Sequence, residues 1–177
     1  LDGSDVVINH CFEGQPLAPW SHVLANERFG FVATDAGTGH LWHINARENK
    51  INQWRNDSLL TLGTETLSAF ISGRPVSLFA AEDGFTCRVT YGFGWAEWRK
   101  TIGDVQFTTT AFVPPDRAAR VLMIEASEGS LADIEYYTDL VLAPTRATPF
   151  TPRRGRRAAS SRRKTATTAP LTVRSSA

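Results

Sequence analysis

Apolar and polar residues alternate along most of the first 143 residues of this chain. Between positions 105 and 111 the odd-numbered residues are mostly apolar and the even-numbered ones are polar, which puts two chemistries on opposite faces of a strand. No stretch keeps a sustained helical period. We therefore predict strands at residues 6–9, 29–34, 40–45, 69–72, 76–80, 85–91, 93–100, 105–113, 120–126 and 134–142.

Short turns separate these predicted strands at regular spacing. Glycine or proline occurs in each of the turns at residues 36–39, 72–75, 82–84, 102–104 and 114–116. Strands at this spacing are typical of two packed antiparallel sheets. With 177 residues, of which 42% are hydrophobic, the chain can form one domain with a filled core. The pattern predicts an all-β fold, an antiparallel β-sandwich.

The distribution of charge divides the chain into two unlike parts. Residues 1–140 contain ten basic and 18 acidic side chains, a net charge of −8, whereas residues 141–177 contain nine basic and no acidic ones. After Phe150 the tail lacks aromatic residues and consists mainly of Arg, Ser, Thr, Ala and Pro. Such a segment buries too little apolar surface to offset chain entropy. We predict a domain at residues 1–148 and a disordered basic tail at residues 149–177.

Several classes of function are disfavoured by composition. The basic tail has no interleaved aromatic residues and follows an acidic domain, so we expect no nucleic-acid partner. No apolar run approaches the roughly 18–20 residues that span a bilayer. The first residues have neither the basic region nor the apolar stretch of a signal peptide. Two cysteines, Cys11 and Cys87, form no disulfide framework, and we expect buried thiols in a cytoplasmic protein.

A series of motifs resembles one known family. Residues 18–31 read APWSHVLANERFGF, residues 45–50 read NARENK, residues 88–94 read RVTYGFG and residues 110–114 read TAFVP. In this order they resemble the cellobiose phosphorylase family, in the branch with cyclic β-1,2-glucan synthases and β-1,2-oligoglucan phosphorylases. Residues 54–57, WRND, continue the likeness, although Gln53 stands where that family usually has proline. The resemblance covers about residues 5–148.

The resemblance implies a fold, an activity and partners. The fold is an amino-terminal β-sandwich of the super-sandwich type, which abuts an (α/α)6 barrel, often across a homodimer. The family cleaves β-linked glucooligosaccharides with inorganic phosphate as co-substrate and inverts the anomeric centre. Its catalytic acid lies in the barrel, where phosphate replaces the water of an inverting hydrolase. We therefore assign no catalytic residue and no cofactor to this chain, and expect it to be inactive by itself.

The tail departs from the family pattern. The family continues from this point into a hydrophobic segment and a helical linker, whereas here arginine-rich sequence follows Phe150. An abrupt change to Arg, Ala, Ser, Thr and Pro is what a shifted reading frame of a GC-rich gene yields. We interpret residues 149–177 as the product of a frameshift or truncation.

One polar stretch is the candidate binding site. Arg47 offers a planar set of five donors, Glu48 two acceptor oxygens and Asn49 both kinds of group. Trp42 and Trp54 flank the triplet with flat apolar faces of the kind on which sugars stack. These five residues are candidates for contact with a sugar. The alternative is structural: Arg47 and Glu48 form an ion pair that fixes a turn, and both tryptophans belong to the core.

Other residues favour structural roles. Trp20 is expected to anchor the first strand in the core. Trp95 and Trp98 are three residues apart on a strand, so they should lie on opposite faces. The same geometry separates His40 from His43, and we expect no metal site. A β-sandwich with exposed tryptophan is also typical of free-standing carbohydrate-binding modules, which remains the alternative function.

Overall fold

The computed structural model describes residues 19–53, 65–79, 85–127 and 133–141 with their side chains, and the backbone of residues 6–10 and 169–174. Within these residues all regular elements are strands. They are β1 (Val6–His10), β2 (Ser21–Ala25), β3 (Phe29–Thr34), β4 (Gly37–His43), β5 (Glu65–Ile71), β6 (Arg74–Ser77), β7 (Cys87–Gly92), β8 (Trp95–Ile102), β9 (Val105–Phe112), β10 (Ala119–Ala126), β11 (Asp133–Thr138) and β12 (Ala169–Arg174).

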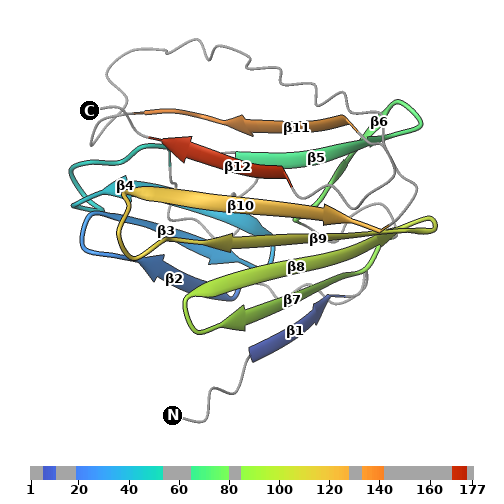
Figure 1. The fold of residues 1–177 in the computed structure, drawn as a ribbon, viewed down its shortest axis with the longest axis horizontal. Helices are drawn as coiled ribbons and strands as arrows, with labels where there is room; N and C mark the ends of the chain where they lie inside the picture. The colour runs from blue at the N-terminus through green and yellow to red at the C-terminus, as the bar shows by residue number, and fades with distance from the viewer. Residues whose placement is uncertain are drawn as a thin grey trace.

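The strands form three antiparallel sheets. The largest has the order β1-β7-β8-β9-β10-β12, and the two smaller ones have the orders β11-β5-β6 and β2-β3-β4. In Figure 1, β3 and β4 lie behind β9 and β10. The core fills the space between them. Phe31 and Leu41 come from the β2-β3-β4 sheet, and Val89, Trp98 and Phe107 come from the six-stranded sheet. The predicted all-β antiparallel sandwich is thereby confirmed.

Each of the ten predicted strands overlaps an observed one, and two observed strands were not predicted. In β2 the inward positions are His22 and Leu24, but the outward ones include the apolar Val23 and Ala25, so the sequence does not show the alternation that reveals a half-buried strand. The other addition, β12, lies in the segment predicted to be disordered. Residues 169–174 pair with β10, so the prediction needs correction there, because pairing with an open sheet edge uses the backbone and requires little apolar side-chain surface. The rest of the tail lies outside the described residues.

The tryptophans divide between core and surface. Trp98 is fully buried, packs edge-on against Phe79 and donates a hydrogen bond from its indole to the carbonyl of Thr34, at 3.0 Å. Trp95 is half-buried on the opposite face of β8, as its spacing predicts. The expectation that Trp20 anchors the core is wrong, because its side chain is 62% exposed. Its backbone provides the anchor instead: the Trp20 carbonyl accepts a hydrogen bond from the Tyr91 hydroxyl at 2.9 Å.

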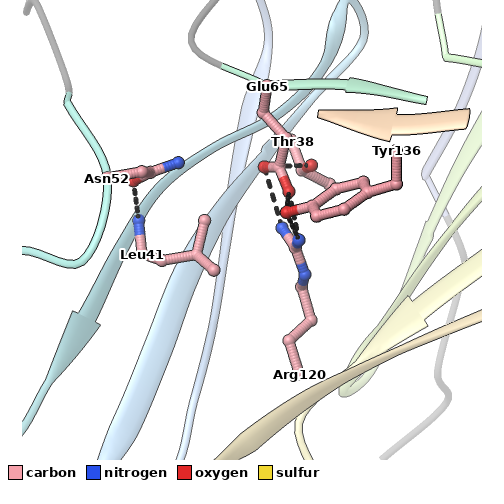
Figure 2. A network of polar contacts seen from close by, with 6 residues as sticks. All are labelled: Thr38, Leu41, Asn52, Glu65, Arg120 and Tyr136. Carbon is pink, nitrogen blue, oxygen red and sulfur yellow. Dashed lines mark hydrogen bonds and ion pairs between the residues drawn. The ribbon is translucent and has the colours of Figure 1, made fainter. Parts of the chain in front are cut away.

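A buried polar network joins all three sheets, as Figure 2 shows. Arg120 of β10 donates from both terminal nitrogens to the carboxylate of Glu65 on β5, and one of the two also donates to the Tyr136 hydroxyl of β11. The Glu65 carboxylate further accepts hydrogen bonds from Tyr136 and from Thr38 of β4, the latter at 2.6 Å. The guanidinium also lies 5.3 Å from the Phe31 ring centre. Neither charged side chain of the pair is exposed, so the network fixes the relative position of the sheets.

Asn52 makes a second buried polar link. It is fully buried, and its side-chain oxygen accepts a hydrogen bond from the backbone N–H of Leu41, at 2.7 Å (Figure 2). Its backbone forms an isolated bridge with Leu140. The segment that leaves β4 is therefore tied both to its own sheet and to the chain after β11. This contact holds the segment that follows β4 against the segment that follows β11.

Candidate functional site

The candidate triplet lies in a turn that follows β4. The turn closes where the N–H of His43 donates to the carbonyl of Asn49, at 3.0 Å. Inside it, the side-chain oxygen of Asn45 accepts hydrogen bonds from the backbone N–H groups of Arg47 at 2.8 Å and Glu48 at 3.1 Å. Asn and Asp side chains stabilise turns in this way. The first asparagine of the NARENK motif therefore shapes the turn, and the side chains after it are free to face solvent.

Arg47 and Glu48 form an exposed ion pair. The distance from Arg47 Nε to Glu48 Oε1 is 3.3 Å, and the two side chains are 90% and 55% exposed. Asn49 is exposed as well. An ion pair in this environment contributes only about 0–1 kcal/mol to stability. The structure thus contains the ion pair of the structural alternative, and it also leaves the polar groups accessible to a ligand.

Trp42 packs at the base of the same turn. Its backbone bridges to Lys50, on the returning side of the turn. Its half-buried indole covers Gly30 so closely that a Cβ at that position would lie 2.3 Å from a ring atom. His40 lies two residues before Trp42 on β4, and the centres of the two rings are 5.1 Å apart. Trp42 is therefore held in place at the base of the turn, against Gly30 and His40. Trp54, the fifth candidate, lies outside the described residues.

Ile44 was not identified from the sequence. Its φ of 61° is in the left-handed region, where a β-branched residue is strained, and its side chain is 64% exposed. Its backbone N–H donates to the Arg28 carbonyl at 2.8 Å, which holds it there. Strain of this kind is often found where a protein presents a binding surface. No signal in the alternation pattern could have revealed it, because the strain depends on how the turn meets Arg28.

Two further loops are locked to this turn. The side-chain nitrogen of Asn26 donates to the carbonyls of Pro114 and Arg117, both at 2.7 Å, and its oxygen accepts from two backbone N–H groups of its own turn. Arg28 donates to the carbonyl of Asp116 at 2.9 Å. We call residues 26–28, 44–50 and 114–117 together the loop end. Because loops from two sheets are joined by hydrogen bonds, this surface is organised before any ligand arrives.

The loop end presents charges of both signs. In addition to the pair at the turn, Arg117 and Asp116 lie 3.7 Å apart, with side chains 68% and 76% exposed. Each pair places guanidinium donors beside carboxylate acceptors. Such alternating groups suit a ligand with many hydroxyls, which donate and accept in equal measure. They suit a polyanion less well, because a carboxylate accompanies the guanidinium groups of Arg47 and Arg117.

A second exposed surface lies at another corner. Phe93 is 98% exposed at the tip of the turn between β7 and β8, followed by Gly94 with a φ of 86°. His22 of β2 is hydrogen bonded to the carbonyl of Gly92 through Nε2, at 3.1 Å, so the start of β2 lies against this turn. We call Trp20 and Phe93 the aromatic corner. It displays two large apolar side chains from a backbone fixed by hydrogen bonds.

The remaining chemistry of the described residues is limited. Cys87 is buried, as predicted, and its thiol lies 3.4 Å from the Phe79 carbonyl. Burial raises the pKa of this thiol to about 12, so it is protonated and unreactive at neutral pH. Cys11 lies outside the described residues. Among the residues with described side chains, no group of His, Cys, Asp and Glu could hold a metal ion, and no helix there could cross a membrane.

Comparison with known proteins gives two matches. The sequence profile described as "Glycosyl hydrolase 94, supersandwich domain" matches residues 5–147. Cyclic beta-(1,2)-glucan synthase NdvB of Rhizobium meliloti (strain 1021) is 25% identical over 93 residues, which cover 50% of this chain and 3% of that protein. The chain thus spans a very small part of the length of this curated relative.

Proposed function

The chain belongs to the glycosyl hydrolase 94 family through its supersandwich domain, and we propose that it is the carbohydrate-binding and structural domain of an inverting glycoside phosphorylase or of a cyclic β-1,2-glucan synthase module. The proposed ligand is a β-linked glucooligosaccharide. The proposed partner is a catalytic (α/α)6 barrel in the same parent protein, which uses inorganic phosphate as co-substrate. A cytoplasmic location and a homodimeric parent enzyme belong to the same proposal.

The observation that carries the proposal is the loop end. Its turn displays Arg47, Glu48 and Asn49 to solvent on a backbone held by Asn45. Trp42 lies at the base of the same turn, packed against Gly30. A backbone held in one conformation before binding reduces the entropy lost when a flexible sugar binds. The same surface suits the mouth of a catalytic domain, where it would contact the part of the substrate that projects outward.

Catalysis is assigned to the partner domain. An inverting mechanism requires a carboxylic acid to protonate the leaving oxygen while phosphate attacks the opposite face. Glu48 is the only carboxylate of the candidate triplet, and it is exposed and paired with Arg47. Nothing among the described residues around this exposed side chain encloses a substrate or excludes water, so it is not assigned as the general acid. This domain therefore contributes contacts and leaves the chemistry to the barrel.

The experiment separates binding from catalysis. Purified chain is incubated with β-1,2- or β-1,4-glucooligosaccharides and phosphate, and glucose 1-phosphate is measured; we expect none. Binding of the same sugars is followed by NMR shifts of the backbone amides of residues 44–50. Arg47→Ala should weaken binding. The control variant Arg99→Ala removes another exposed arginine paired with a glutamate, Glu97, outside the loop end, and should leave binding unchanged. Release of glucose 1-phosphate, abolished by a substitution in residues 1–143, would overturn the assignment.

The aromatic corner favours a second candidate function, that of a free-standing carbohydrate-binding module. Trp20 and Phe93 are exposed by 62% and 98%, and both offer flat apolar faces on which a sugar ring can stack. In that case the isolated chain would bind glucan through these rings. Trp20→Ala and Phe93→Ala would then abolish binding, and Arg47→Ala would not. The two candidates thus predict opposite results from the same titration.

A further inference from the structure

Strand β10 lies between two different neighbours in the large sheet. On one side it pairs with β9, from Val121 opposite Phe112 to Ala126 opposite Phe107. On the other side it pairs with β12, from Ala119 opposite Arg174 to Ile124 opposite Ala169. Among the described strands, β12 is the last one of this sheet and pairs with β10 alone. Residues 139–168 separate β12 from β11 along the chain.

Without β12, β10 would be an edge strand that carries a buried charged side chain. It carries Arg120, whose guanidinium is fully buried and bound to Glu65 and Tyr136 on other strands. Edge strands expose a row of unpaired N–H and C=O groups, and proteins normally protect them. Water reaching this edge would come next to a buried ion pair, which is strongly destabilised when it is disturbed. The edge of β10 therefore requires a cover.

The pairing strand comes from outside the residues that match the family. The family match ends at residue 147, whereas β12 comprises residues 169–174. Recognition between the two strands runs along the backbone, and strand addition of this type tolerates different side chains. We propose that the open edge of β10 is a binding site for an extended peptide segment that pairs antiparallel to it, and that this chain fills the site with its own residues 169–174. The inference does not depend on the proposed function.

Pro170 gives the orientation of the ladder. It lies opposite Met123 and has no N–H to donate. Proline is accepted in an edge strand where the N–H would face solvent, so residue 170 points its missing donor away from β10. N–H directions alternate along a strand. The N–H of Thr172 therefore also points away from β10, whereas the N–H groups of Leu171 and Val173 point toward it. By the same alternation, the N–H groups of β10 that face β12 belong to the residues opposite these two, Leu122 and Arg120.

The test uses the full chain and amide hydrogen exchange measured by NMR. Leu171→Pro removes a donor that faces β10, and Thr172→Pro, one residue away, removes a donor that faces solvent. Leu171→Pro removes the hydrogen bond that the Leu171 N–H donates to the Leu122 carbonyl and so weakens the pairing of β12. Exchange at the amides of Arg120 and Leu122, which donate to the carbonyls of Val173 and Leu171, should therefore speed up by about fivefold or more. The amides of Val121 and Met123, which face β9, are the internal control. Thr172→Pro should leave all four unchanged.

A second step tests whether the site accepts a peptide. A synthetic peptide with the sequence of residues 167–176 is added in excess to the Leu171→Pro chain, and protection at Arg120 and Leu122 should return. Equal effects of the two prolines, unchanged exchange in both, or no recovery with peptide would overturn the proposal. So would recovery by dimerisation without peptide, seen as a doubled mass in light scattering. If Leu171→Pro does not fold, Val173→Pro removes a ladder bond nearer the strand end and serves the same purpose.

Discussion

Arg120 pairs with Glu65 in the interior of the sandwich, whereas Arg47 pairs with Glu48 on the loop end. The side chains of the first pair are fully buried, and those of the second are 90% and 55% exposed. The partners of the first pair are 55 residues apart in the chain, and those of the second are neighbours. The same two residue types therefore connect three sheets in the core and form an exposed pair on a turn at the loop end.

The difference lies in the groups around each pair. The Glu65 carboxylate accepts hydrogen bonds from Thr38 and Tyr136 in addition to Arg120, so its lone pairs are used. Burial lowers the pKa of the Arg120 guanidinium, but the charges of Glu65 and Tyr136 and the hydrogen bonds to both together outweigh burial and raise this pKa. Arg120 thus remains charged inside the protein. Arg47 and Glu48 have water as their main partner, so their removal changes little in the folded state.

The largest effect is expected from breaking the buried pair. Arg120→Ala leaves the Glu65 carboxylate buried without its counter-ion, which should lower the free energy of unfolding by about 3–5 kcal/mol. Urea denaturation followed by tryptophan fluorescence measures this, since Trp98 is in the core. The double variant Arg120→Met with Glu65→Leu removes both charges together and should recover much of the loss. A single variant as stable as the double one would show that the pair does not act as a unit.

The contrast between the two pairs also explains what the sequence could predict. The alternation in β9, where Phe107 and Ala111 are buried, comes from solvent on one side of a sheet and core on the other, so local sequence is enough. The Arg120–Glu65 pair depends on the packing of β10 against β5, which no local pattern contains. Arg47 was identified because its motif is contiguous in the chain.

The errors have related physical causes. Trp20 was assigned to the core because large aromatic residues are usually buried, yet its anchor is its carbonyl, which no side-chain pattern reveals. Composition predicted disorder at residues 169–174, where the backbone of β10 offers a pairing edge. The strain at Ile44 arises only when the turn meets Arg28. In each case a backbone hydrogen bond determines the observed structure, and the pattern of side chains in the sequence does not predict that bond.

A smaller effect is expected from loosening the loop end. Asn26→Ala removes two hydrogen bonds to the turn at residues 114–117 and two within its own turn, and should cost about 2 kcal/mol. The matched variant Asn45→Ala removes two hydrogen bonds in an exposed turn and should cost about half as much. Urea denaturation of both variants gives the comparison. Equal losses of stability would mean that the two hydrogen bonds from Asn26 to Pro114 and Arg117 add nothing to the stability that Asn26 gives to its own turn.

A pH-dependent effect is expected at His40, which is buried beside Trp42. Burial, followed by the charge of Lys50, lowers the pKa of this imidazole below 6.5, and a backbone hydrogen bond with Ala46 opposes the shift. The unfolded chain therefore takes up a proton at a higher pH than the folded one. The stability that His40 contributes is full above about pH 6.5 and declines as pH falls toward the folded pKa, by at most about 1.4 kcal/mol per pH unit.

Thermal unfolding at a series of pH values checks this sign. His40→Asn should flatten the decline in melting temperature between about pH 7 and pH 5, and asparagine suits the positive φ of 29° at this position. Lys50→Gln removes the repelling charge and should narrow the window. A wild-type protein that becomes more stable as pH falls through this range would reverse the assignment.

The smallest effect on stability, and the sharpest test of function, is expected at Arg47. Its side chain is 90% exposed and paired only with its neighbour, so Arg47→Ala should change the free energy of unfolding by less than about 1 kcal/mol. In a full-length enzyme of the proposed kind, the same substitution should reduce phosphorolysis of β-glucooligosaccharides, because the turn after β4 then lacks its guanidinium donors. Arg99→Ala is the control, since that side chain is exposed and paired with Glu97 outside the loop end. If the Arg47→Ala domain unfolds, or the full-length variant keeps the wild-type rate, the triplet serves only to fix its turn. The experiment thus asks whether an ion pair that contributes almost nothing to the fold is there for a ligand.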